Sequence, residues 1–169
     1  IEVRGILRQM DVTKCNEFSK QQIKTTLQLM KDKNLEFVNL GSSATMHFAD
    51  GAEREKNLDE AKRYIDLATQ INCPFIRVFP NNFLKSQERQ QTIDLIVNGL
   101  VTLGNYAKGT GVKVLMETHG DLVYTEDLHN IMNNVAHRDT GLIWDVSNMW
   151  TVTKESPAEV YKKLKPYIH

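Results

Sequence analysis

The stretch Val112–Gly120, VKVLMETHG, runs through apolar residues and ends on a glutamate, a threonine, a histidine and a glycine. Its apolar residues predict a strand over Val112–Thr118. Successive side chains of a strand point to opposite faces, so one face carries Lys113, Leu115, Glu117 and His119. The question that decides the fold is why a strand with a buried face should end on a carboxylate and an imidazole.

The rest of the chain alternates between short apolar runs and longer stretches with a helical period. The other predicted strands are Ile1–Leu7, Glu36–Gly41, Phe75–Phe79 and Gly141–Val146. Amphipathic helices are predicted between them, over residues 23–30, 58–68, 93–107 and 128–135. Regular alternation of this kind predicts parallel strands joined by crossover helices.

Two architectures contain five such units: a five-stranded doubly wound sheet, or part of a (β/α)8 TIM barrel, which normally needs about 250 residues. Central strands of a doubly wound sheet are buried on both faces and tend to be unbroken apolar runs. Here Arg77 interrupts one predicted strand, and Glu2 and Arg4 share a face of another, where we expect an internal ion pair. The glycine-rich phosphate-binding motifs of open sheets are also absent. We therefore favour the incomplete barrel and keep the doubly wound sheet as the alternative.

Composition limits the class of protein. The 169 residues are 41% apolar and 25% charged, which predicts one globular domain over residues 1–169. Lysine plus arginine and aspartate plus glutamate both number 21, so no net charge favours nucleic acid or a membrane as partner. Two distant cysteines and the lack of a long apolar run indicate a cytoplasmic protein. Open sheet edges would favour a homo-oligomer.

The next predicted strand repeats the pattern of the first. Gly141–Trp150, GLIWDVSNMW, places Asp145 directly after an apolar run. In a barrel the carboxyl ends of neighbouring strands meet at one mouth, where catalytic groups lie. Paired carboxylates there suit a divalent metal ion, whose charge offsets their repulsion. Each residue alone would as readily be a helix N-cap or a loop hydrogen-bonding group.

At these residues the sequence resembles the xylose isomerase-like barrels, which include sugar-phosphate isomerases and epimerases. IEVRGI is similar to the second strand of that family, and VLMETHG and LIWDVSNMW are similar to its fifth and sixth strands. The stretch from Asn57 to Pro80 is similar to the family's helix and following strand. The closing LKPYIH resembles the approach to a seventh strand. The resemblance therefore implies a barrel that lacks its first βα unit and its last strands.

In this family a divalent metal is held by a glutamate that ends strand five, an aspartate that ends strand six, and two further ligands. The resemblance implies Glu117 and Asp145 as metal ligands for Mn²⁺, Mg²⁺, Co²⁺ or Zn²⁺, with the other two beyond His169. It also implies that Glu117 is the catalytic base. Relatives often carry a histidine three residues after the aspartate, where this chain has Asn148. An amide can bind a hydroxyl but cannot shuttle a proton.

The function implied is a metal-dependent isomerase or epimerase of a sugar or sugar phosphate, acting by proton transfer through an enediolate. The residues expected to bind substrate are His119, Asn148, Trp144 and Asn81. A polyol or inosose dehydratase with the same metal site is one alternative, and a non-catalytic sugar-binding barrel is another. An abasic-site endonuclease fits less well, because its multi-metal centre needs more strand-end histidines than this chain has.

Overall fold

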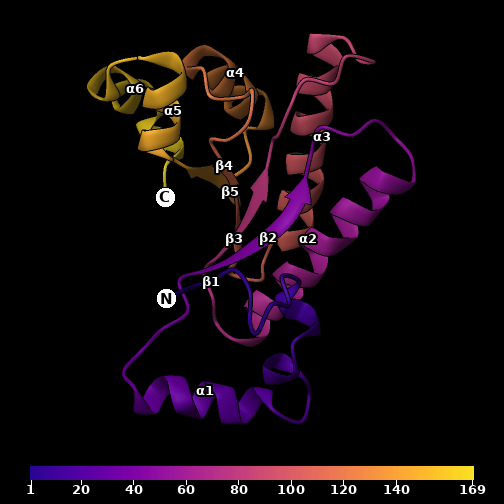
Figure 1. Cartoon of the computed structure of the whole chain (residues 1–169), viewed down its shortest axis with the longest axis vertical. Helices are drawn as coiled ribbons and strands as arrows, with labels where there is room; N and C mark the ends of the chain where they lie inside the picture. The colour runs from indigo at the N-terminus through magenta and orange to yellow at the C-terminus, as the bar shows by residue number, and fades with distance from the viewer.

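The computed structural model describes residues 1–169 and contains one sheet of five parallel strands (Figure 1). The strands are β1 (Glu2–Val3), β2 (Asn39–Thr45), β3 (Phe75–Phe79), β4 (Lys113–Glu117) and β5 (Thr140–Ile143). The α-helices are α1 (Ile23–Asp32), α2 (Ala52–Gln70), α3 (Arg89–Ala107), α4 (Thr125–Val135), α5 (Val146–Thr153) and α6 (Pro157–Leu164). Three short 3₁₀ turns are η1 (Val12–Lys14), η2 (Asn16–Phe18) and η3 (Lys165–Tyr167). None of the helices is both long and apolar enough to cross a membrane.

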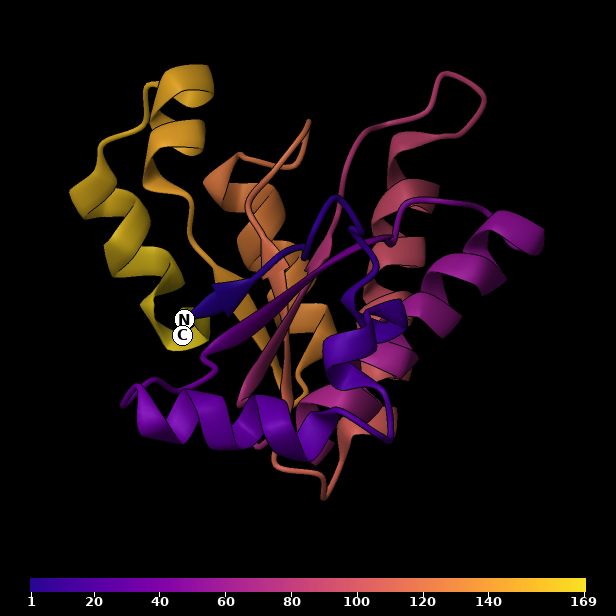
Figure 2. The ribbon, with the colours of Figure 1, turned by 60° about the horizontal axis from the view of Figure 1, so that its bottom comes forward.

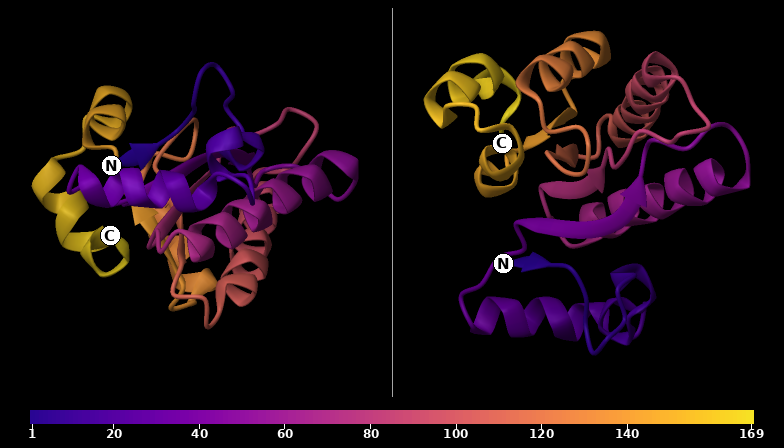
Figure 3. Two further views of the ribbon diagram at one scale, coloured as in Figure 1. Left: turned by 90° about the horizontal axis from the view of Figure 1, so that it is seen from below. Right: turned by 45° about the horizontal axis from the view of Figure 1, so that its top comes forward.

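The order of the strands decides between the two predicted architectures. Each strand lies beside the one before it, in the order β1-β2-β3-β4-β5. A doubly wound sheet reverses its strand order and carries helices on both faces. Here the helices follow one another along an arc outside the sheet (Figures 2 and 3). The incomplete barrel is confirmed, and the doubly wound alternative is wrong.

The two faces of the sheet differ as the strand pattern predicts. The helix-facing side chains belong to a core cluster of 34 buried residues, which from the strands includes Leu40, Ile76, Val78, Val114, Met116 and Leu142. On the inner face Gly41, Arg77 and Leu115 lie side by side in register. Glu117 pairs with Ile143 one layer nearer the mouth. The polar residues therefore line the concave side of the sheet.

Three predicted strands differ from the observed ones. β5 ends at Ile143, three residues before the predicted end, because Asp145 caps α5, which begins at Val146. β1 is only two residues long, because the chain turns back after Gly5 and Ile6 pairs with Gln9 across Leu7 and Arg8, both at positive φ. β2 begins three residues later than predicted and continues through a serine pair to Thr45. This is possible because the buried Ser42 hydroxyl donates to the Arg77 carbonyl of β3 at 2.5 Å.

The end of the described chain begins a further parallel pairing. Ile168 forms a parallel bridge with Leu142, and the His169 amide donates to the Leu142 carbonyl at 3.1 Å. The His169 ring lies 6.1 Å from the Phe75 ring, at the amino end of β3. His169 therefore lies at the opposite end of the sheet from Glu117.

Candidate active site at the carboxyl ends of the strands

The ends of β4 and β5 are joined by a short hydrogen-bond network. The Thr118 amide donates to the Ile143 carbonyl at 3.0 Å, which extends the ladder past Glu117. The Asp145 amide donates to the Thr118 hydroxyl at 2.9 Å. Glu117 and Asp145 therefore lie at the same edge of the sheet, on adjacent strand ends.

Glu117 forms an ion pair with a residue that the sequence pattern did not assign to the site. Arg77 Nη1 lies 3.0 Å from Glu117 Oε2, and their side chains are 5% and 16% exposed. Arg77 Nη1 also lies 3.8 Å from Glu2 Oε1. The predicted ion pair between Glu2 and Arg4 is therefore replaced by one between Glu2 and Arg77. The only sequence signal for this contact was a charged residue inside the apolar run of β3.

Asp145 is the N-cap of α5. Its Oδ1 accepts from the Asn148 amide at 2.8 Å, which satisfies one of the free N–H groups of the helix. The Asn148 side-chain nitrogen donates to the Thr118 carbonyl at 3.0 Å. The Asn148 side chain thus supports the loop that carries Asp145, and only its amide oxygen is left without a protein partner.

The remaining predicted substrate residues are in different environments. His119 is exposed, and its ring lies 4.8 Å from the ring of Phe79 at the end of β3. Asn81 follows the same strand with φ of 60°, and its carbonyl accepts from the Asp121 amide. Trp144 instead stacks on Tyr161 of α6, with ring centroids 5.9 Å apart. The structure brings His119 and Asn81 close to the strand ends, while the Trp144 ring packs against a helix.

The two carboxylates supply oxygen donors of the kind that a divalent metal ion prefers. Glu117 Oε1 and Asp145 Oδ2 have no hydrogen-bond partner, and oxygen donors suit ions such as Mg²⁺ and Mn²⁺. Nowhere in the chain do three His, Cys, Asp or Glu side chains gather in an arrangement that would hold a metal. Any further ligands of the ion would be water molecules or protein groups other than these two carboxylates.

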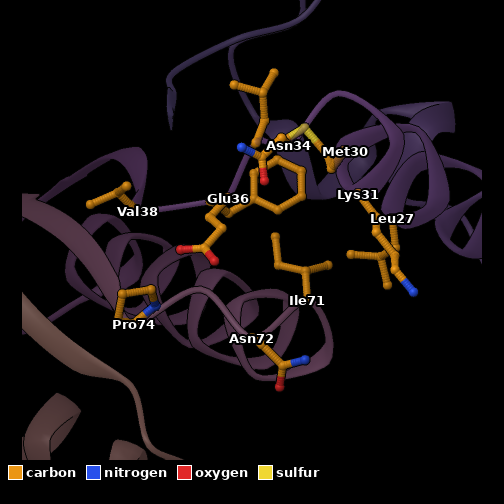
Figure 4. Close-up of a pocket in the computed structure, with 11 residues that line it drawn as sticks. Leu27, Met30, Lys31, Asn34, Glu36, Val38, Ile71, Asn72 and Pro74 are labelled. Carbon is orange, nitrogen blue, oxygen red and sulfur yellow. The ribbon is translucent and has the colours of Figure 1, made fainter.

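A well-formed pocket lies elsewhere. It has a volume of about 670 Å³ and is lined by the end of α1, the segment that leads into β2 and the segment that leads into β3 (Figure 4). Leu27, Met30 and Ile71 form its apolar side, while Lys31 and Glu36 are among its polar residues. This pocket is at the amino ends of the strands, and barrel active sites lie at the carboxyl ends. The candidate site is therefore the edge that holds Glu117 and Asp145.

The sequence profile of the family described as "Xylose isomerase-like TIM barrel" matches residues 7–169. The chain belongs to this family. No curated protein matches the sequence significantly. Among solved structures, the probable 3-DHS dehydratase AsbF from Bacillus anthracis aligns with a TM-score of 0.74 at 21% identity, over 91% of this chain and 57% of that one.

Two other solved structures have the same fold. A xylose isomerase-like TIM barrel protein from Mycobacterium smegmatis, in complex with magnesium, aligns with a TM-score of 0.71 at 21% identity, over 92% of this chain and 56% of that one. The 3-keto-D-glucoside 4-epimerase YcjR from E. coli aligns with a TM-score of 0.75 at 13% identity, over 88% and 62%. The chain thus spans less than two thirds of the length of these proteins.

Proposed function

We propose that the protein is a divalent-metal-dependent isomerase or epimerase that acts on a sugar or sugar phosphate. The observation that carries the proposal is the pair of carboxylates, Glu117 and Asp145, on adjacent strand ends of a xylose isomerase-like barrel. The 3-keto-D-glucoside 4-epimerase and the magnesium complex among the solved structures of the same fold support it. The partner is then a small molecule, and neither nucleic acid nor a membrane.

In this proposal Glu117 removes a proton from the carbon next to the substrate carbonyl. In an isomerisation it returns the proton to the neighbouring carbon, and in an epimerisation a second acid delivers a proton to the opposite face of the same carbon. Arg77 holds its Oε2, and its Oε1 has no hydrogen-bond partner. A bound divalent ion would supply Lewis acidity toward the substrate oxygens, with Glu117 and Asp145 among its ligands. His119 and Asn81 would contact substrate hydroxyls at the rim.

A dehydratase is the second candidate. The solved dehydratase is 21% identical to this chain, against 13% for the 3-keto-D-glucoside 4-epimerase. A dehydratase begins with the same proton abstraction but then expels a hydroxyl group as water. Glu117 would keep its role as base, and the two candidates differ in the fate of the carbanion.

The experiment is a measurement of metal content followed by a proton-exchange screen. We would incubate the protein in D₂O with ketoses, phosphorylated sugars, inososes and 3-dehydroshikimate, and follow each by NMR. Deuterium incorporated next to a carbonyl, with an isomer formed, supports the isomerase or epimerase. An unsaturated product supports the dehydratase. A protein that binds sugars but holds no divalent metal and exchanges no proton would be a binding barrel and would refute both.

A further inference from the structure

A buried arginine stands on the inner face of β3, and its guanidinium contacts a carboxylate, a carbonyl and an aromatic ring. Arg77 Nη1 lies 3.0 Å from Glu117 Oε2, and Nη2 donates to the Ser42 carbonyl at 3.1 Å. The guanidinium carbon lies 4.3 Å from the centroid of the Phe79 ring. Gly41 leaves room for the guanidinium, because a Cβ there would lie 3.0 Å from Arg77 Nη2. The arginine is therefore fixed from three strands.

Stability does not explain why this position carries an arginine. Burying a guanidinium has a large desolvation cost, and a buried ion pair is often no more stable than apolar side chains of similar size. The Nε of Arg77 is buried without a partner, which adds to the cost. Leu115 occupies the same layer of β4, in register with Arg77. The inner face therefore accepts an apolar side chain at this depth.

We propose that Arg77 is a positioning residue that acts through Glu117. The inference rests on the proposed function, in which Glu117 is the base. The ion pair engages Oε2 and leaves Oε1 unpaired, so the guanidinium determines which oxygen points into the site and restricts rotation of the carboxylate. Displacing a catalytic group by about 1 Å can cost about 10²-fold in rate.

The ion pair also affects metal binding, in the direction opposite to its effect on turnover. A positive charge 3.0 Å from a carboxylate disfavours a second cation on that carboxylate. Removing the charge should strengthen Mn²⁺ binding while it lowers turnover. A residue that only stabilised the fold would, when removed, weaken both. The direction of the change in Mn²⁺ affinity therefore separates the two roles.

The test compares four variants. Arg77→Met removes the charge at similar length, and Arg77→Lys keeps the charge without the planar fork. Gly41→Ala keeps the charge but displaces the guanidinium. Ser43→Ala is the matched control, because Ser43 is an exposed residue of β2 whose hydroxyl makes no hydrogen bond. We would measure the Mn²⁺ dissociation constant by calorimetry, and kcat and KM by exchange of the substrate proton with D₂O.

We expect Arg77→Met to bind Mn²⁺ about 3- to 10-fold more tightly and to lose about 10²-fold in kcat. Arg77→Lys should have an intermediate kcat. Gly41→Ala should lose kcat while its Mn²⁺ affinity rises by less than that of Arg77→Met, and Ser43→Ala should match the wild type. Folded Arg77→Met with wild-type kcat would overturn the inference, and so would a joint loss of kcat and Mn²⁺ affinity. If Arg77→Met does not fold, Gly41→Ala and Arg77→Lys decide by the same criteria.

The same data separate the inference from the proposed function. A wild type that binds Mn²⁺ but exchanges no proton refutes the proposed function alone. Tighter Mn²⁺ binding by Arg77→Met then still supports the contact with Glu117, and unchanged binding overturns it. A wild type that binds no Mn²⁺ overturns both.

Discussion

Glu117 and Asp145 occupy matching strand ends, yet different groups hold them. The Glu117 carboxylate lies against a guanidinium, whereas the Asp145 carboxylate caps a helix. Asparagine is as good an N-cap as aspartate, so Asp145→Asn should leave the fold intact and remove only the charge. The two residues can therefore be tested separately for metal binding and for proton transfer.

We predict that substitutions of these two carboxylates respond differently to added metal ion. Asp145→Asn should weaken Mn²⁺ affinity and regain part of its activity in excess Mn²⁺. Glu117→Gln cannot accept a proton from carbon, so a loss of about 10²- to 10⁴-fold should persist at saturating Mn²⁺. His119→Ala should raise KM at unchanged metal content. Metal stoichiometry and solvent-proton exchange measure all three, and wild-type turnover by metal-loaded Glu117→Gln would show that Glu117 is not the base.

The loops that follow β3 and β4 form one unit. The Asp121 amide donates to the Asn81 carbonyl, and Asp121 Oδ2 accepts from the Phe83 amide at 2.9 Å. Gly120, which precedes Asp121, has a φ of 68°, and a Cβ there would collide with the Asn81 carbonyl. This packing fixes the loop that carries His119.

At the scale of these elements we predict that Gly120→Ala is more disruptive than Gly109→Ala. Both glycines have positive φ, but a Cβ at Gly109 would meet no atom within 4 Å. Gly109→Ala should lower the free energy of unfolding by about 1–2 kcal/mol, the cost of a left-handed conformation for alanine. Gly120→Ala should lower it further and raise KM through His119. Urea unfolding and exchange kinetics provide the measurements. Equal losses in the free energy of unfolding would mean that the Asn81 carbonyl can move away from the added methyl group.

The stability of the whole molecule should depend on a histidine far from the carboxylates in sequence. The His47 side chain is buried, its Nδ1 has no partner, and burial lowers the pKa of its imidazole below 6.5. The carbonyls on either side of it, those of Met46 and Phe48, both accept from Arg54. The native state therefore holds the ring neutral, in a loop that cannot move easily.

We predict an acid destabilisation from this residue. Below about pH 6.5 the unfolded chain binds a proton that the native His47 does not, so the unfolded state gains stability. The free energy of unfolding should be independent of this group above pH 6.5. It should then fall by up to about 1.4 kcal/mol per pH unit until the lowered native pKa is reached. Burial and nearby Lys113 lower the pKa of His169 as well, so His47→Phe is the informative variant. Urea unfolding from pH 5 to 8 should show a shallower decline for His47→Phe, and identical slopes would contradict the prediction.

Local periodicity was enough to determine much of this fold. The bounds of β3 match the predicted Phe75–Phe79, and β4 lies within the predicted Val112–Thr118. Alternation along a strand depends only on neighbouring residues, so the shared face of Leu115 and Glu117 could be read directly. Glu117 and Asp145 each follow an apolar run, and the regular alternation of strands and helices predicted that these two strands are neighbours.

The tertiary structure decided the contacts that cross between strands and layers. Arg77 reaches Glu117 across 40 positions, and only the order and register of β3 and β4 bring them together. The stacking of Trp144 on Tyr161 depends on how α6 returns to the sheet, which local periodicity does not encode. β2 extends to Thr45 only because the β3 carbonyl at Arg77 accepts the buried Ser42 hydroxyl. Such interactions join residues far apart in sequence, so their partners become known only when the chain is folded.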